Sequence, residues 1–534
     1  MKSRSLHLPV RDALPLMACG KPARLALHVF LALGILTLSA LFLGDDAGAW
    51  GGKPAVAHPA SAARSMAPAQ TGSDTTGYPN CRFGVGQAHH SVASYNASSL
   101  NLGWYLDWRT QTSPPRPGGI EYIQVLHTSD GGYSPSEAVL ETVIAANPGA
   151  LWLVGNEPDC IWQNNTLPQN YARVYHDAYT FIKAQDPTAR VAVGGIVQPT
   201  PLRMEYLDIV LDEYAARYGE PLPTDAWNIH SFILREEHNS WGCEIPPGIA
   251  ADQGMLYTLD DTDSLDIFQQ RLVQFRYWMH DRGYRDTPLI ISEYGTLLPY
   301  YGPLYYDSEG NPFDEARARD FMYGTFDFLL TASDPDLGYP ADEDRLVQRW
   351  LWYSLDDTGY GGALFDPFTL ASMQLGADFG AYTASISPTL DLFAVDVGQI
   401  GPVPYSPTST ATITLRARVS NVGNIAITQP VTVRFLDGDG YQIGSDQIIS
   451  ETIAGCAEVK EVTMAWSNVT PGGHVVRVIV DPGDEMSEGN ENNNEVYGVV
   501  LVAKEQVFFP LVTRKGRWGA SSQATMMAIR CRRR

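Results

Sequence analysis

Eight short apolar segments, most of them separated by longer stretches with helical spacing, constrain the fold of this chain more than any other feature. The segments are Phe83–Val85, Leu102–Leu106, Tyr122–Leu126, Leu151–Val154, Val191–Val193, Ala226–Ile229, Leu289–Ile291 and Leu351–Leu355. The stretches between them repeat apolar residues at helical intervals; Tyr171, Val174 and Ala178, for example, share one helical face. Strands that alternate with helices lie parallel to one another, so eight such units predict an α/β fold of the TIM, or (β/α)8, barrel type.

One of the intervening stretches cannot form a full helix. Thr110–Gly119 lies between the second and third predicted strands and contains three prolines, which remove backbone donors and clash with the preceding turn. The predicted helices elsewhere are Ser134–Ala146, Asn170–Ala184, Met204–Tyr218 and Leu265–Arg282. We therefore expect a barrel that is incomplete or trimmed at this early position.

After residue 388 the spacing of apolar residues changes from helical to alternating. The alternating segments are Leu390–Leu392, Thr412–Val419, Val431–Phe435, Val459–Met464 and Val475–Val480. Turn sequences such as Asn421–Asn424 and Asp437–Gly440 separate them. This pattern predicts a second, all-β domain, an immunoglobulin-like sandwich of about seven strands. The polar stretch Ala384–Pro388 indicates a domain boundary that few contacts cross.

The first 49 residues have the pattern of an export signal. Basic residues precede the apolar run Leu25–Leu43, and Ala47–Ala49 follows as a small-residue cleavage pattern. The run is long enough to span a bilayer, so a cleaved signal peptide and an uncleaved signal anchor both remain open. The rest of the chain is expected to be secreted or to lie on the extracellular surface, with a membrane anchor at its N-terminus in the second case.

These patterns divide the chain into five parts. We predict a signal peptide or signal anchor at 1–49, a flexible linker at 50–78, the barrel at 79–387, the sandwich at 388–503 and a basic tail at 504–534. Residues 50–503 contain 24 basic and 56 acidic residues, a net charge of −32. A charge of this sign repels phosphate backbones, which argues against nucleic acid as a partner of the folded part. We expect a monomer.

The cysteines and acidic residues indicate neither a zinc site nor a calcium site. Six cysteines are too few for a disulfide scaffold, and no Cys-x-x-Cys pair is present. Cys160 and Cys243 lie in loops on the same predicted face, where they form either a disulfide or two separate thiols. Asp484, Glu485 and Glu488 lack the spacing of a calcium-binding loop and are interpreted as solvated. We predict no metal and no cofactor.

Two predicted strands, the fourth and the seventh, are each followed by a glutamate. Glu157 stands in the sequence Asn-Glu-Pro-Asp, and Glu293 in Ser-Glu-Tyr. Reactive residues of a parallel barrel lie at the carboxyl ends of its strands, so these two side chains are expected to meet in the barrel mouth. Two carboxyl groups in that arrangement can cleave an acetal, because one protonates the leaving oxygen while the other attacks the sugar carbon.

The Asn-Glu-Pro after strand four and the Glu after strand seven resemble clan A glycoside hydrolases, which are retaining (β/α)8 enzymes. The resemblance covers residues 81–386 and implies that Glu157 is the acid/base and Glu293 the nucleophile. It also implies a polysaccharide or oligosaccharide substrate. Asn-Glu-Pro-Asp is also similar to small-barrel endo-β-1,3-glucanases, although the sequence leaves the sugar and the linkage open.

The same resemblance implies further substrate-binding residues near the strand ends: Asn156, Arg109, His127, His230, Tyr294 and Trp352. Family members commonly carry a tyrosine where Phe232 stands, so Tyr294 becomes the candidate donor of a hydrogen bond to the nucleophile. Trp350 competes with Trp352 for the position on the eighth strand. Aromatic residues of the predicted loops, such as Trp108, suit the apolar faces of sugars.

The C-terminal domain resembles a CARDB module through Val419–Gly423 and Glu488–Asn494, which implies a spacer or a binding domain. Two classes of function remain. One is a secreted retaining glycosidase that acts on a β-linked polysaccharide by double displacement, and the other is a non-catalytic, glycan-binding surface adhesin. The two glutamates favour the enzyme, since a binding protein does not need them.

Overall fold

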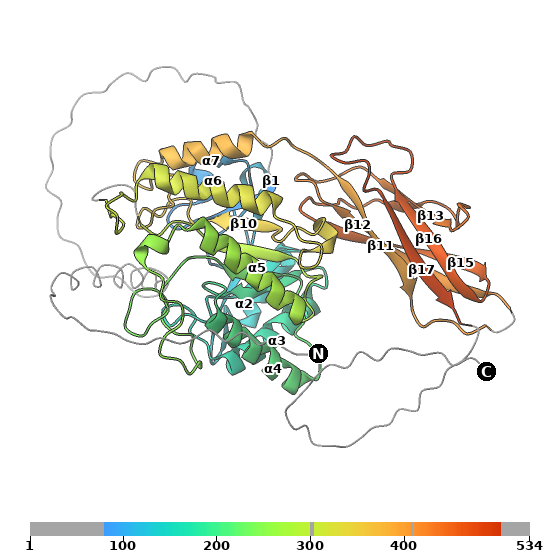
Figure 1. The fold of residues 1–534 in the computed structure, drawn as a ribbon, viewed down its shortest axis with the longest axis horizontal. Coiled ribbons are helices and arrows are strands. Elements are labelled where there is room, and N and C mark those ends of the chain that lie inside the picture. The colour runs from blue at the N-terminus through green and yellow to red at the C-terminus, as the bar shows by residue number, and fades with distance from the viewer. Residues whose placement is uncertain (1–79, 299–303, 407–408, 504–534) are drawn as a thin grey trace, which may run out of the picture.

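The computed structural model describes residues 80–298, 304–406 and 409–503, which form two domains joined near residue 388 (Figure 1). Strands alternate with helices in the N-terminal domain, whereas the C-terminal domain is built of strands. The predicted export signal, linker and basic tail lie outside the described residues. Within the described ranges, no helix combines the length and the apolar character needed to cross a membrane.

Ten strands are described in the N-terminal domain. They are β1 (Asn80–Gly86), β2 (Leu102–Leu106), β3 (Glu121–Tyr122), β4 (Gln124–Ser129), β5 (Gly132–Ser134), β6 (Leu151–Asn156), β7 (Arg190–Gly195), β8 (Trp227–His230), β9 (Leu289–Tyr294) and β10 (Arg349–Trp352). The third predicted strand is split into β3 and β4 at Ile123. The hairpin strand β5, which pairs antiparallel with β4, was not predicted.

The strands are hydrogen bonded in the order β3-β2-β1-β10-β9-β8 in one sheet and β5-β4-β6-β7 in another. Every pairing except that of β5 is parallel. Isolated parallel bridges, Ala192 to Ala226 and Ile196 to Ile229, connect the edge of β7 with β8. The strand order is thus that of a (β/α)8 barrel, but the ladders form two open sheets, so the predicted TIM barrel is confirmed in part.

Helices follow the later strands of this domain. They are α2 (Glu137–Ala146), α3 (Pro168–Gln185), α4 (Pro201–Tyr218), α5 (Leu265–Asp281), α6 (Glu315–Thr331) and α7 (Gln374–Ala384). Proline at the first position starts α3 and α4 because its missing N–H needs no partner there. Side chains of Ser264 and Asp314 cap α5 and α6.

The early part of the domain lacks α-helices, as the prolines predict. A single 3₁₀ turn, Pro117–Gly119, lies between β2 and β3. The connection between β1 and β2 also contains only short 3₁₀ turns, Val92–Ser94 and Ala97–Leu100, which the sequence analysis did not anticipate. The expected trimming is therefore confirmed and extends one connection further.

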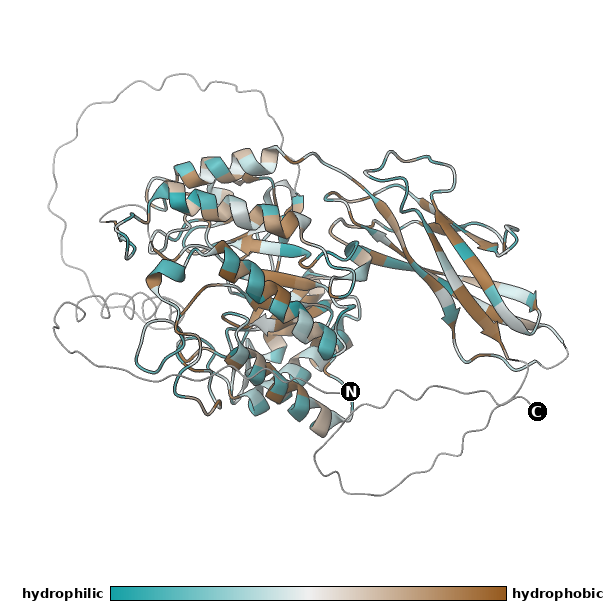
Figure 2. Ribbon diagram, viewed as in Figure 1, coloured by the Kyte–Doolittle hydropathy of each residue, from teal (hydrophilic) through white to brown (hydrophobic). Residues whose placement is uncertain are grey.

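Alternate residues of each strand face two different cores. In β6, Leu151 and Leu153 pack in one apolar cluster with Ile290 of β9. Trp152 and Val154 belong instead to the larger cluster that the helices cover. In Figure 2 the strands are mostly hydrophobic, while the covering helices alternate hydrophobic and hydrophilic residues. This alternation places every second strand side chain on the face enclosed by the strands.

The C-terminal domain is the predicted sandwich. Its strands are β11 (Leu392–Ile400), β12 (Ala411–Asn421), β13 (Val431–Asp437), β14 (Gln447–Ile449), β15 (Glu458–Val469), β16 (Gly472–Val480) and β17 (Glu495–Val502). They form two antiparallel sheets, β11-β12-β15 and β14-β13-β16-β17. Inward residues such as Leu415, Val433 and Val478 are fully buried between the sheets.

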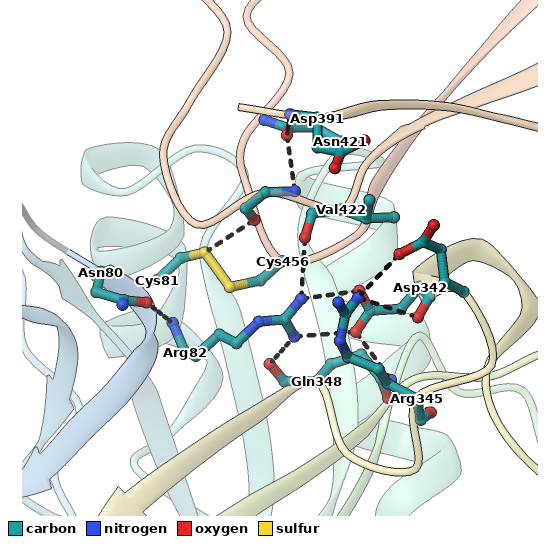
Figure 3. Close-up of polar contacts among 12 residues, drawn as sticks. Asn80, Cys81, Arg82, Asp342, Arg345, Gln348, Asp391, Asn421, Val422 and Cys456 are labelled. Atoms are coloured by element: carbon teal, nitrogen blue, oxygen red, sulfur yellow. Dashed lines mark hydrogen bonds and ion pairs between the residues drawn. A yellow bond between two sulfur atoms is a disulfide. The ribbon is translucent and has the colours of Figure 1, made fainter. Parts of the chain in front are cut away.

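The two domains are joined by a disulfide and a buried arginine (Figure 3). Cys81 at the start of β1 is bonded to Cys456 of the sandwich. Arg82 donates to both carboxylate oxygens of Asp342, at 2.8 and 2.9 Å, and to the carbonyl oxygen of Val422, at 3.1 Å. The expectation that few contacts cross the domain boundary was therefore wrong. The Arg82 guanidinium has enough donors to bind acceptors of both domains at once.

Candidate active site

Glu157 and Glu293 come from strands on opposite halves of the N-terminal domain. Glu157 follows β6 directly, and Glu293 is the second-to-last residue of β9. Their side chains are almost entirely buried, and one carboxylate oxygen of each lies within 4.8 Å of the other. The two glutamates that were predicted to meet at the carboxyl ends of the strands therefore lie close together.

His230, the last residue of β8, lies between the two carboxyl groups. Its Nδ1 is 2.9 Å from Glu157 Oε1, and its Nε2 is 3.5 Å from Glu293 Oε1. The imidazole is 1% exposed, so these two carboxylates replace water around it. Glu157, His230 and Glu293 also offer three metal-ligand atoms within 4.8 Å of one another, of which His230 Nδ1 and Glu157 Oε1 lie at hydrogen-bonding distance.

Trp108 adds a hydrogen-bond donor to Glu293. Its indole Nε1 donates to Glu293 Oε1 at 2.5 Å, and the tryptophan follows β2 in a left-handed backbone conformation with φ 58°. Glu157 also has a left-handed φ, 45°, which its N–H bond to the Gly195 carbonyl oxygen helps to hold. Such conformations are costly for residues other than glycine and concentrate where a side chain must be aimed.

Burial and charge change the protonation of this cluster. Burial is the main reason that the pKa of Glu293 is raised to about 7; nearby Glu157 acts in the same direction, and His230 and Trp108 oppose both. Burial alone would lower the pKa of His230, but the two carboxylates raise it above its ordinary value. The pKa of Glu293 therefore lies near neutrality and that of His230 above its ordinary value, shifts of the kind found at sites of acid–base and nucleophilic chemistry.

A disulfide borders the other side of Glu157. Cys160, in the loop after β6, is bonded to Cys243, in the loop after β8, and both are buried. The Cys243 sulfur lies 3.9 Å from Glu157 Oε2, a packing contact because a bonded sulfur carries no proton. Of the two alternatives that the sequence left open for these cysteines, the disulfide is correct.

A fully buried ion network fixes the loop that carries Glu157. Arg203 of α4 binds Asp159 Oδ2 at 2.6 Å and Glu236 Oε1 at 2.9 Å. Asp159 also accepts the backbone N–H of Val197, which follows β7. The network thus ties together the segments that follow β6, β7 and β8, next to Glu157.

Three of the other predicted residues lie near the glutamates but bind neighbouring protein groups. His127 Nε2 lies 2.8 Å from the Trp108 carbonyl oxygen, and burial lowers the pKa of His127. Asn156 is buried directly before Glu157. Arg109 forms an ion pair with Asp107 of its own loop, with its side chain 58% exposed. His127 therefore positions the Trp108 loop, while Arg109 remains accessible at the rim.

Tyr294 and Trp352 face away from the glutamates, which corrects their predicted roles. The Tyr294 hydroxyl lies 3.4 Å from Thr325 Oγ1 of α6, and its ring packs edge-on against Trp352. The Trp352 Nε1 donates to the carbonyl oxygen of Gly362. Successive residues of a strand point to opposite faces, so Tyr294 cannot share the direction of Glu293.

Tyr353 is the aromatic residue that the sequence analysis missed. Its ring packs 5.6 Å from that of Trp108, and its hydroxyl donates to Asp357 Oδ2 at 2.6 Å. The eighth strand was predicted to run to Leu355, which hid the fact that β10 ends at Trp352. An aromatic residue directly after the true strand end would have indicated a site residue.

Comparisons with known proteins agree with this arrangement. Residues 82–238 match the family model described as glycosyl hydrolase catalytic core, and residues 391–498 match the CARDB family model. No curated protein matches the chain. The first domain is thus similar to a glycosyl hydrolase catalytic core and the second to a CARDB domain, which confirms the resemblance drawn from the sequence.

Several solved structures are similar at low sequence identity. A GH128 subgroup II endo-β-1,3-glucanase from Pseudomonas viridiflava is 14% identical and covers 57% of this chain and 98% of its own, with a TM-score of 0.38. A GH128 subgroup I endo-β-1,3-glucanase from Amycolatopsis mediterranei, in complex with laminaritriose, is 18% identical and covers 56% and 99%, with a TM-score of 0.37. The CARDB domain of a Pyrococcus furiosus protein, in complex with di-metal ions, is 23% identical and covers 22% and 99%, with a TM-score of 0.19.

Proposed function

We propose that this protein is a secreted, retaining glycoside hydrolase that cleaves a β-linked polysaccharide by double displacement. The observation that carries the proposal is the pair of buried carboxyl groups, Glu157 and Glu293, whose nearest oxygens lie within 4.8 Å. Retaining enzymes hold their two carboxyl groups about 5 to 5.5 Å apart, whereas inverting enzymes leave about 6.5 to 9.5 Å for a water molecule. The short separation supports the retaining reaction.

In the first step, protonated Glu157 donates its proton to the glycosidic oxygen while the Glu293 carboxylate attacks the anomeric carbon. The bond to the leaving sugar breaks, and a glycosyl ester of Glu293 forms. In the second step, ionised Glu157 takes a proton from water, whose oxygen attacks the anomeric carbon and releases Glu293. The Trp108 donor and the His230 ring hold the Glu293 carboxylate in place before it attacks.

Two features of the wider structure support the proposal. The bridges from β7 to β8 would close the two sheets into one complete (β/α)8 barrel, whose carboxyl-end face carries both glutamates. The two disulfides, Cys81–Cys456 and Cys160–Cys243, are typical of exported proteins and support secretion or display on the extracellular surface, as the N-terminal export pattern predicts.

A β-1,3-glucan is the first substrate to test. The Asn-Glu-Pro-Asp sequence at 156–159 is similar to small-barrel endo-β-1,3-glucanases, and the GH128 structures described above are those of endo-β-1,3-glucanases. The test panel also contains mannans, xylans and other β-glucans, because the sugar is not determined by the two glutamates.

The decisive experiment follows the anomeric configuration of the product by proton NMR during hydrolysis. We expect the β-anomer to appear first, because two displacements restore the original configuration. Glu293→Gln and Glu157→Gln should each abolish turnover of the polymer, whereas Glu309→Gln, at an exposed position of the same domain, should leave it unchanged. An α-anomer as first product would contradict double displacement.

The alternative function is a non-catalytic, glycan-binding surface adhesin. A folded wild-type protein that binds glycans but hydrolyses no member of the panel would favour it over the enzyme.

A further inference from the structure

A hollow of about 460 Å³ lies between the loop after β1 and the loop after β10. Both loops follow the carboxyl ends of strands, so the hollow opens on the same face of the domain as the two glutamates. It is lined by His89, His90, Asp357, Thr358, Gly359, Pro367 and Phe368. None of these residues takes part in the proposed chemistry.

One wall of the hollow is held in place by Asp356. Its carboxylate accepts the backbone N–H groups of Ala88, His89 and His90 and the hydroxyl of Tyr95. Asp356 is fully buried, so these bonds attach the loop after β1 firmly to the loop after β10. The two imidazoles are therefore presented from a fixed backbone while their rings remain exposed.

The opposite wall ends in an aromatic ring that packs on little else. Phe368 is 89% exposed, yet its backbone is held in a tight turn. Its N–H donates to Asp366 Oδ1 at 2.8 Å, and the Leu370 N–H donates to the Asp366 carbonyl oxygen at 2.8 Å. Backbone hydrogen bonds of the turn, and not packing of the ring itself, thus hold Phe368 at the rim of the hollow.

Side-chain contacts connect the hollow to the nucleophile. Asp357, in the hollow, accepts the hydroxyl of Tyr353, whose ring packs on Trp108. Trp108 in turn donates to Glu293. Tyr353 and Trp108 are themselves buried, so this series of contacts fixes the position of the hollow relative to Glu293.

The lining selects the chemistry of the occupant. Phe368 and Pro367 offer an apolar surface for the C–H face of a pyranose ring, while the imidazoles and the Asp357 carboxylate offer partners for its hydroxyl groups. Acidic sugars are disfavoured, because Asp357 and a net charge of −32 over residues 50–503 repel anions. Neutral hexoses meet both conditions.

We propose that this hollow is a distal sugar-binding subsite, which binds a neutral β-linked hexose unit of the same chain that is cut between Glu157 and Glu293. The inference rests on the proposed function, since it assigns the occupant from the glycan held at that site. The proposal adds Phe368 to the residues that bind the glycan, and the contribution of Phe368 to binding affinity should depend on the length of the glycan.

The test measures binding in full-length Glu293→Gln protein, in which a carboxamide keeps the shape of the carboxylate but prevents turnover. Calorimetry with laminaritriose, laminarihexaose and matched neutral tri- and hexasaccharides of the other panel sugars compares this protein with its Phe368→Ala derivative. Tyr277→Ala, which removes a 55% exposed ring of α5, is the matched control. We expect Phe368→Ala to weaken hexasaccharide binding about tenfold, with less than a twofold effect on the trisaccharide, and Tyr277→Ala to change neither.

Equal hexasaccharide affinities with and without Phe368, or no binding of any oligosaccharide, would overturn the subsite. A loss of equal size on the tri- and hexasaccharide would also overturn it, because it would place the ring beside the scissile bond. Hydrolysis by the wild-type protein is measured separately. Binding that depends on Phe368 in a protein without hydrolytic activity would support the subsite and reject the proposed reaction.

Discussion

At the residue scale, the place of His230 depends on a glycine of the neighbouring strand. A Cβ added to Gly195 would lie 2.5 Å from His230 Cδ2 and 2.6 Å from its Nε2. The ring cannot move aside, because Glu157 and Glu293 lie on either side of it. Gly195 therefore provides the space in which the two carboxyl groups and the imidazole meet.

Gly195→Ala should lower kcat by about a hundredfold, since a displacement of about 1 Å among reacting groups has an effect of that size. KM should change little, because the substitution lies beneath the substrate. Steady-state kinetics on a soluble oligosaccharide checks this, and Gly398→Ala, where a Cβ would meet nothing within 4 Å, is the control. Unchanged kcat in a folded Gly195→Ala protein would mean that His230 is not needed where it lies.

The pH dependence of the reaction follows from Glu293. Burial raises its pKa to about 7, and a nucleophile must be ionised, so the reactive fraction falls as the pH drops through that value. We expect kcat/KM to decrease about tenfold per pH unit below this pKa. Trp108→Phe removes a donor to the carboxylate, which should shift this limb to higher pH. A rate that is constant from pH 7 to pH 5 would contradict the assignment of Glu293 as nucleophile.

At the scale of elements, the loops after β6 and β8 are tied by the Cys160–Cys243 disulfide next to Glu157. The second disulfide, Cys81–Cys456, lies at the start of β1, at the opposite ends of the parallel strands. The chain therefore offers two disulfides that differ in their distance from the chemistry.

Cys160→Ala combined with Cys243→Ala should lower kcat about tenfold or more, because the loop that aims Glu157 loses its tie. Cys81→Ala combined with Cys456→Ala should leave kcat on short oligosaccharides unchanged while lowering the free energy of unfolding by about 2 to 4 kcal/mol. Kinetics well below the unfolding temperature and denaturant unfolding separate the two effects. Equal kcat in both double variants would contradict a positioning role for the first disulfide.

At the scale of the whole molecule, the C-terminal sandwich contacts the N-terminal domain at the strand ends that lie opposite the two glutamates. Arg82 and Cys81 at the beginning of β1 make the connection, together with Asn493, which donates to Glu343 at 3.0 Å. The contacts at this junction place no sandwich residue at the chemistry. The sandwich can therefore stabilise the N-terminal domain without taking part in the reaction.

A protein of residues 78–387 carrying Cys81→Ser should fold and retain kcat on short soluble oligosaccharides, because Asp342, the main partner of Arg82, stays with the barrel. Its unfolding temperature should fall, since the disulfide and the bond to Val422 are lost. Activity on insoluble polymer should fall further if the sandwich supplies a second attachment. Calorimetry and assays on both forms of substrate test this, and an unfolded truncated protein would show that the sandwich is part of the barrel's folding unit.

The sequence by itself determined the order of the parallel strands, four of the six described helices, the trimmed connection before the third strand, the sandwich and the two glutamates that follow the fourth and seventh predicted strands. Each of these depends on local features, namely the periodicity of apolar residues, the prolines and the residue that follows a strand. The split of the third strand and the exact end of β10 could not be predicted from the sequence, because hydrogen bonds to neighbouring strands decide where a strand ends. That error of three residues concealed Tyr353.

Only the tertiary structure decided which atoms meet. His230 contacts Glu157 across 73 positions of the chain, and Trp108 contacts Glu293 across 185, so no local pattern could pair them. Tyr294 points toward the helices because side chains alternate along a strand. Its direction can be predicted from the sequence only after the direction of Glu293 is known. Arg82, at the start of β1, likewise contacts Val422, which lies 340 positions further along the chain. Contacts of this kind depend on the stagger of strands and the packing of whole domains, which is physical information that the spacing of residues does not contain.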